Sequence, residues 1–129
     1  MQARILVLER GGSLARKVAK FLSGQEYGVH VAPANRSSLA FLVTFQPDLV
    51  LLQVEDSEDW SLFREIRSRS GVPLILCSST WNQADAVRGL RQGADDYVRW
   101  PSSARELSAR ILARLRRAEW NASDKQACS

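Results

Sequence analysis

The 129-residue chain has little of several residue types on which whole classes of function depend. It holds two cysteines, one histidine and one methionine. Cys77 lies inside an apolar run and Cys128 near the chain end, which provides neither a disulfide framework nor the close spacing of metal ligands. The apolar runs are also short, and residues 39–43 and 49–52 fall far below the roughly 20 residues that cross a bilayer. We therefore expect no metal, no disulfide scaffold and no membrane span.

The overall proportions of apolar and charged residues are typical of one folded domain. Apolar residues make up 45% of the chain and charged residues 25%, far from the values of disordered segments. Eighteen Lys and Arg against 14 Asp and Glu give a formal net charge of +4. The first residues carry too short an apolar stretch for a signal peptide. We predict a single domain in the cytoplasm.

Five short apolar runs alternate with helical patterns along the chain. This alternation predicts βαβ units and a parallel sheet. The first, third and fourth runs consist almost wholly of Ile, Leu and Val, which is typical of strands covered on both faces, so we place them at the centre. The five runs are residues 4–8, 29–32, 48–53, 73–77 and 96–99.

Between these runs, apolar residues recur at helical spacing and predict five helices. The two clearest stripes are Leu14, Val18 and Leu22, and Leu107, Ile111 and Leu115. A further helix is expected at residues 37–45. After residue 117 the periodicity ends, so we predict a folded domain at residues 1–118 and a flexible tail or linker at residues 119–129.

Polar or amphipathic residues stand where the predicted strands end. In an open α/β sheet the ligand site lies beyond the carboxyl ends of the strands. Glu9 and Arg10 follow the first strand, and Gln53 ends the third. Ser78 follows the fourth strand and Trp100 the fifth. We expect these five residues to share one cleft.

Three segments carry a resemblance to a known family. They are PDLVLL at residues 47–52, VPLIL at residues 72–76 and GLRQGADDYVRWP at residues 89–101. With the residues at the strand ends, they make the chain resemble the receiver domain of bacterial two-component response regulators over about residues 3–117. The resemblance implies a CheY-like, flavodoxin-like α/β fold, with a doubly wound five-stranded parallel sheet in the order 2-1-3-4-5. It also implies a regulatory protein rather than an enzyme.

In that family, two acidic residues after the first strand hold Mg²⁺, and an Asp ending the third strand accepts a phosphoryl group from a histidine kinase. A Ser or Thr and a Lys then bind the phosphoryl oxygens. At the matching positions this chain has Arg10 beside Glu9, Gln53 for the Asp and Trp100 for the Lys, and only Ser78 is retained. A neutral amide has no anionic oxygen to attack phosphorus, and a guanidinium repels Mg²⁺. We therefore predict a degenerate phosphorylation site, no cofactor, and a pseudo-receiver that signals without phosphate.

Other residues at the strand ends keep more than one interpretation. Glu9 and Arg10 either form a charge pair that fills the former metal site or are two solvated side chains. Tyr97 matches the family's switch aromatic and is either locked in one rotamer or an ordinary half-buried strand residue. The loop with Glu55 and Asp56 either supports unorthodox metal or phosphoryl chemistry or supplies negative charge to the start of a helix.

Gln53 and Ser78 have a simple structural explanation. Gln53 is expected to be a hydrogen-bonded amide, and Ser78 to form a hydrogen bond with local backbone.

Three tryptophans, Trp60, Trp81 and Trp100, fall in or beside the loops after the strands. They form either a partner surface or the packing over the vacated pocket.

The last predicted helix, residues 103–117, carries basic residues beside its apolar stripe, namely Arg105, Arg110, Arg114, Arg116 and Arg117. It resembles the final receiver helix of the winged-helix (OmpR/PhoB-type) response regulators, which dimerise through the fourth helix, fifth strand and fifth helix. The matching charges are Arg88 with Glu106 and Asp96 with Arg110, so the resemblance implies a homodimer. A basic helix is also typical of direct nucleic-acid binding, which stays an alternative.

These interpretations combine into one functional hypothesis. We predict the regulatory domain of a response regulator that controls transcription, working through dimerisation and contacts with other signalling proteins. DNA would be reached only through an effector domain outside this sequence, and that part of the hypothesis depends on family analogy.

Overall fold

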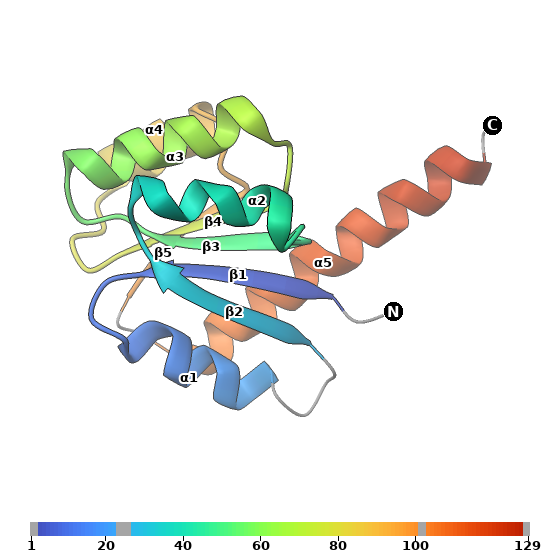
Figure 1. The fold of residues 1–129 in the computed structure, drawn as a ribbon, viewed down its shortest axis with the longest axis horizontal. Coiled ribbons are helices and arrows are strands. Elements are labelled where there is room, and N and C mark those ends of the chain that lie inside the picture. The colour runs from blue at the N-terminus through green and yellow to red at the C-terminus, as the bar shows by residue number, and fades with distance from the viewer. Residues whose placement is uncertain (1–2, 23–26, 101–102, 128–129) are drawn as a thin grey trace.

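Five parallel strands form one sheet in the order β2-β1-β3-β4-β5 (Figure 1). The structure is a computed structural model that describes residues 3–22, 27–100 and 103–127. The predicted strands, the central place of the first, third and fourth, and their order are confirmed. The strands are β1 (Arg4–Glu9), β2 (Gly28–Pro33), β3 (Leu49–Gln53), β4 (Leu74–Ser78) and β5 (Asp96–Arg99).

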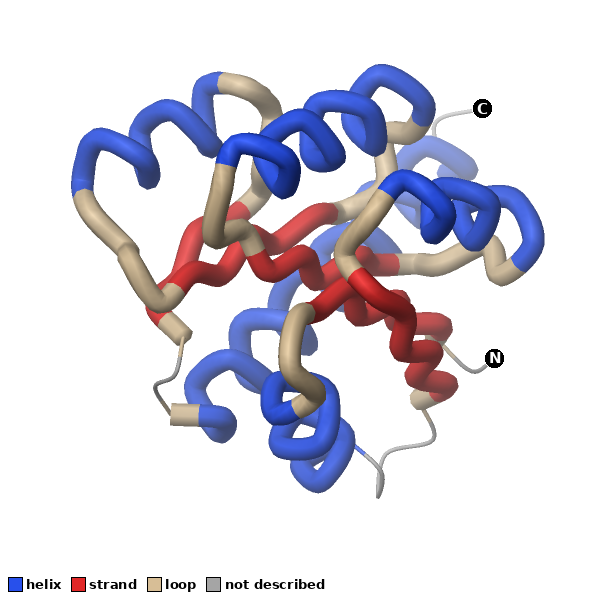
Figure 2. Tube along the Cα trace, turned by 60° about the vertical axis from the view of Figure 1, so that its left-hand side comes forward, coloured by secondary structure: helices blue, strands red, loops and turns tan. Residues whose placement is uncertain are grey.

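Helices cover both faces of this sheet. In Figures 1 and 2, α2, α3 and α4 lie on one face, and α1 and α5 lie on the other. The second predicted helix is split into a 3₁₀ turn, η2, and the short α2, which ends at Thr44, two residues before Gln46 with its positive φ of 52°. The helical elements are α1 (Ser13–Leu22), η2 (Arg36–Ala40), α2 (Phe41–Thr44), α3 (Ser57–Arg69), α4 (Gln83–Arg91) and α5 (Ala104–Ala127).

The central strands are almost wholly apolar, with polar residues only at strand ends, because both faces of each strand are buried. Successive side chains of a strand point to opposite faces. In β1, Leu6 and Leu8 therefore enter the core with α3, whereas Ile5 and Val7 enter the core with α1 and α5. The second of these cores also holds the apolar stripes predicted on the first and last helices, except Leu22, whose side chain lies outside what the structure describes.

The sequence predicts a flexible tail or linker after residue 118. In the structure, α5 continues through this segment to Ala127, and its last turns project past the sheet in Figure 1. The apolar stripe ends at Leu115, but residues 118–127 contain no Gly or Pro that would stop a helix. None of the helices that the structure describes is long and apolar enough to span a membrane.

We expect shortening of a core side chain on β3 to destabilise the domain. Val50 is 0% exposed, so Val50→Ala should lower the free energy of unfolding by about 2 kcal/mol. Val43 on α2 is 75% exposed, and Val43→Ala should change the free energy of unfolding by less than about 0.5 kcal/mol. Urea unfolding followed by circular dichroism measures both values, and equal losses would contradict this description of the core.

Candidate functional site

The carboxyl ends of four strands bring the expected site residues to one edge of the sheet. Leu8 pairs with Leu52 between β1 and β3, which places the next residues, Glu9 and Gln53, beside each other at that edge. Gln53 pairs with Cys77 between β3 and β4, one residue before Ser78. The backbone N–H of Trp100 donates to the carbonyl of Ser78 at 2.9 Å.

Gln53 is hydrogen-bonded at both ends of its amide. Its Oε1 accepts the backbone N–H of Arg10 at 3.0 Å, and its Nε2 donates to Glu55 Oε1 at 3.2 Å. The residue is half-buried. The amide therefore joins the end of β1 to the loop that follows β3.

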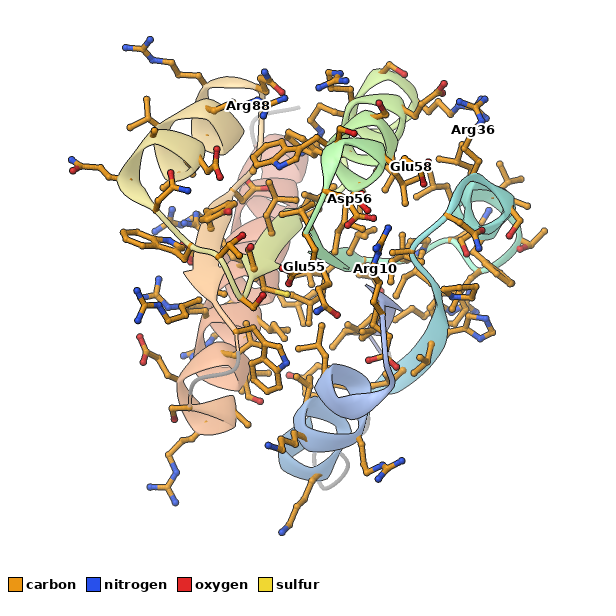
Figure 3. The ribbon with its side chains drawn as sticks, turned by 90° about the vertical axis from the view of Figure 1, so that its left-hand side faces the viewer. Arg10, Arg36, Glu55, Asp56, Glu58 and Arg88 are labelled. Carbon is orange, nitrogen blue, oxygen red and sulfur yellow. The ribbon has the colours of Figure 1, made fainter. Side chains whose placement is uncertain are left out.

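The Arg10 side chain reaches across the strand ends to the start of α3. Its Nη2 lies 2.9 Å from Asp56 Oδ2 and 3.0 Å from Asp59 Oδ1. Figure 3 shows Arg10 pointing toward Asp56 from the end of β1. The two described ion pairs of Arg10 are thus with the β3–α3 loop and the start of α3, whereas the sequence left Arg10 either paired with Glu9 or solvated. Glu9 itself is buried, with 8% of its surface exposed.

The two aspartates also cap α3. Asp56 Oδ1 accepts the N–H of Asp59 at 3.1 Å, and Asp59 Oδ2 accepts the N–H of Asp56 at 3.2 Å, which is a capping box. Asp59 Oδ2 also accepts the N–H of Glu55 at 2.7 Å. The N–H of Asp59 and then the Arg10 guanidinium lower the pKa of Asp56. The acidic loop therefore acts as a helix cap tied to an arginine.

These residues do not fit the Mg²⁺ ion that the family resemblance implies. A divalent cation needs several free oxygen ligands, mostly carboxylates. Here the carboxylates of Asp56 and Asp59 already accept N–H groups and flank the Arg10 guanidinium. Within residues 3–22, 27–100 and 103–127, no three His, Cys, Asp or Glu side chains gather as a metal-ligand set.

Glu55 joins the β3–α3 loop to the β4–α4 loop by contacting Ser79, a residue that the sequence analysis did not single out. Glu55 Oε1 accepts the N–H of Ser79 at 2.9 Å, and Glu55 Oε2 accepts the Ser79 hydroxyl at 2.6 Å. The neighbouring Ser78 is buried, and its Oγ accepts the N–H of Thr80 at 3.1 Å. The only feature of the sequence that could have marked Ser79 is its hydroxyl side chain directly after Ser78.

The aromatic residues at the strand ends mainly fill the core. Trp100 is 2% exposed and packs in the core with α1 and α5, so it does not belong to an exposed partner surface. Tyr97 is 7% exposed and stacks on Trp60, with ring centroids 6.1 Å apart and an interplanar angle of 19°. The centroid of the Tyr97 ring also lies 6.5 Å from that of Trp81. Burial raises the pKa of Tyr97, while a hydrogen bond with Ser78 opposes this shift.

Three of the four charges expected at a dimer interface meet within one chain. Arg110 Nη1 lies 2.9 Å from Asp96 Oδ2, and Arg110 Nη2 lies 3.1 Å from Glu106 Oε1. Arg88 lies on α4, where its guanidinium stands 4.2 Å from the centroid of the Trp60 ring. The four residues come from α4, β5 and α5, the elements that the resemblance implied.

Comparison with known proteins identifies the family. Residues 5–112 match the family described as "Response regulator receiver domain". The DNA-binding response regulator MtrA of Mycolicibacterium smegmatis is 37% identical over 121 residues, which are 92% of this chain and 53% of MtrA. This chain therefore belongs to the response regulator receiver domain family, as its sequence predicted, and it spans about half the length of that relative.

Solved structures agree with this assignment. The crystal structure of the signal receiver domain of a putative Luxo repressor protein from Vibrio parahaemolyticus has a TM-score of 0.84 and 21% identity, covering 94% of this chain and 95% of that one. This match shows the fold alone. The crystal structure of HP1043, an orphan response regulator of H. pylori, has a TM-score of 0.75 and 28% identity, covering 88% of this chain and 96% of that one.

Loss of the Arg10 charge should destabilise the domain more than loss of a surface pair. Arg10→Gln leaves the carboxylate of Asp59, which is 0% exposed, without its cation, and we expect a loss of about 1–3 kcal/mol. Arg36→Gln breaks a pair with Glu65 whose side chains are 69% and 31% exposed, and should cost about 0–1 kcal/mol. Urea unfolding compares the two, and equal losses would contradict the role given to Arg10.

Proposed function

We propose that this chain is a receiver domain that signals without phosphorylation at the strand-end site. The observation that carries the proposal is the contact of Arg10 with Asp56 and Asp59 beside a Gln53 amide that is hydrogen-bonded through both its oxygen and its nitrogen. Phosphoryl transfer to a receiver needs an anionic nucleophile and a metal ion that neutralises the developing charge. At this site the nucleophile position holds an amide, and a guanidinium supplies the positive charge.

We further propose that the chain is the regulatory domain of a response regulator that controls transcription. Support comes from the relative MtrA, which is described as a DNA-binding response regulator and of which this chain matches about half. The similarity to HP1043, described as an orphan response regulator, supports a receiver that does not depend on a cognate kinase. DNA binding would belong to a segment outside this chain.

The proposed output surface is the α4–β5–α5 face, which we define by Trp81, Val87, Leu90, Arg88, Asp96, Glu106 and Arg110. Val87 and Leu90 of α4 are 43% and 49% exposed, although both are apolar. α4 contacts the sheet through Gly89, where a Cβ would lie 3.1 Å from Leu76 Cδ1, so its larger apolar residues remain outside. An apolar patch rimmed by charges of both signs favours a second copy of the same chain across a two-fold axis.

Incubation with acetyl phosphate and Mg²⁺ should leave the intact mass of the chain unchanged. The physical reason is that Gln53 offers no carboxylate to form an acyl phosphate. A receiver domain with an Asp at this position, treated in parallel, provides the positive control. A phosphoryl group that appears on this chain and disappears in Asp56→Ala would support the alternative of unorthodox chemistry on the acidic loop and overturn the proposal.

The chain should sediment as a dimer, and Arg110→Glu should weaken that dimer by about tenfold or more. Arg110 is the basic member of the charge cluster on the proposed face, and reversal places a third carboxylate beside Asp96 and Glu106. Arg105→Glu makes the same charge change at another exposed position of α5 and should have little effect. Sedimentation velocity over a concentration series measures this, and a parent chain that stays monomeric would remove the dimer proposal.

A further inference from the structure

We propose that the Glu55 carboxylate is a built-in anion that holds the β4–α4 loop and fixes the α4–β5–α5 face in one conformation. The inference rests on the proposed function, because it assigns to a side chain of this site the control that a phosphoryl group would otherwise exert. It concerns residues 55 and 79, which the family resemblance did not mark.

The contact that carries the inference joins the two loops at the strand ends. Glu55 lies two residues after the end of β3, and Ser79 directly follows β4. Both carboxylate oxygens are used, one by the Ser79 N–H at 2.9 Å and the other by the Ser79 hydroxyl at 2.6 Å. Hydrogen bonds to an ionised acceptor are about twice as strong as neutral ones. Two of them to one residue fix the position of the loop.

Residues near the end of β3 and the start of α3 hold Glu55 in place. Its carboxylate is therefore positioned independently of its contact with the β4–α4 loop. Gln53 Nε2 donates to its Oε1 at 3.2 Å. Its backbone N–H donates to Asp59 Oδ2 at 2.7 Å, and Asp59 is held in turn by Arg10. Figure 3 shows Glu55 near Arg10 and Asp56 at the same end of the sheet. A continuous series of side-chain and backbone contacts therefore connects Arg10, through Asp59, to Glu55.

Two indole rings contact Tyr97, and both lie close to the loops that Glu55 joins. Trp60 lies near the start of α3, and its ring stacks on Tyr97 with the ring centroids 6.1 Å apart. Trp81 lies in the β4–α4 loop, and its Nε1 donates to the carbonyl of Tyr97 at 3.3 Å. Tyr97 itself is 7% exposed. Glu55 thus holds the loops beside the rings of Trp60, Tyr97 and Trp81, which we call the aromatic frame.

This frame extends to the proposed output surface. Trp81 is 36% exposed and belongs to the α4–β5–α5 face, and the Arg88 guanidinium lies 4.2 Å from the Trp60 ring centroid. A shift of the β4–α4 loop would move Trp81 against Tyr97 and change that face. Because the anion is part of the chain, the arrangement is permanent and needs no phosphoryl donor.

The test compares Glu55→Gln with Glu58→Gln in the full chain by hydrogen–deuterium exchange. Glu55→Gln removes the charge but keeps the size of the side chain, and should raise the exchange rate of the Ser79 amide about tenfold, which is about 1.4 kcal/mol. It should also raise the acrylamide quenching of Trp81, measured as the difference from a Trp81→Phe background. Glu58 is an exposed acid of α3, so Glu58→Gln makes the same charge change and should alter neither reading.

Either of two results would overturn the inference: unchanged protection of the Ser79 amide in Glu55→Gln, or an equal loss in Glu58→Gln. Ser79→Ala tests the same contact from the other partner, because it removes the hydroxyl donor, and should give a smaller rise in exchange at residue 79. This second variant keeps the inference falsifiable if Glu55→Gln does not fold.

Failure of the proposed function would be seen separately. A phosphoryl group gained from acetyl phosphate would reject signalling without phosphate even if Glu55→Gln loosens the loop. Conversely, an unmodified chain whose Ser79 amide is indifferent to Glu55→Gln would retain the proposed function and reject the built-in anion.

Discussion

The Asp59 carboxylate lies at 0% exposure at the start of α3, and the arrangement of the strand ends depends on how its charge is balanced. A buried carboxylate is costly unless a cation or several donors compensate it. Backbone N–H groups of its own loop and the Arg10 guanidinium provide this compensation. Since Arg10 follows β1, the balance also fixes the β3–α3 loop against the sheet. A metal ion at this place would have to displace the arginine that the aspartates need.

Much of the fold could be predicted because its physical causes are local in sequence. The runs at residues 4–8, 48–53 and 73–77 are apolar except at their ends, and short runs of this kind are typical of strands covered on both faces. The placement of Gln53, Ser78 and Trp100 at one edge follows from the same reasoning, because the carboxyl ends of parallel strands share an edge. The strand order required the family resemblance, since hydrophobic periodicity alone does not specify which strands are neighbours.

What could not be predicted depends on side-chain reach and on competition between partners. The sequence left Arg10 either paired with its neighbour Glu9 or solvated, whereas its long side chain extends from the end of β1 to Asp56 and Asp59. The hydrogen bonds of Glu55 to Ser79 cross from one loop to another, and no spacing in the sequence marks them. The continuation of α5 beyond residue 117 was not expected, because helix length was judged from the apolar stripe alone, whereas the segment lacks a helix stop.

A reversible phosphoryl group lets a receiver change state, whereas fixed charges stabilise one state permanently. In this chain the cation is Arg10 and the proposed anion is Glu55, and both are always present. Any signal must therefore act through a molecule that binds the two states with different affinity, because only differential binding can move a conformational equilibrium. Such a molecule could bind the α4–β5–α5 face beside the aromatic frame, where Trp81, Val87 and Leu90 are exposed. Under the proposed function, regulation by the concentration of a partner, including a second copy of the chain, follows from that constraint, and regulation by kinase activity at Gln53 does not.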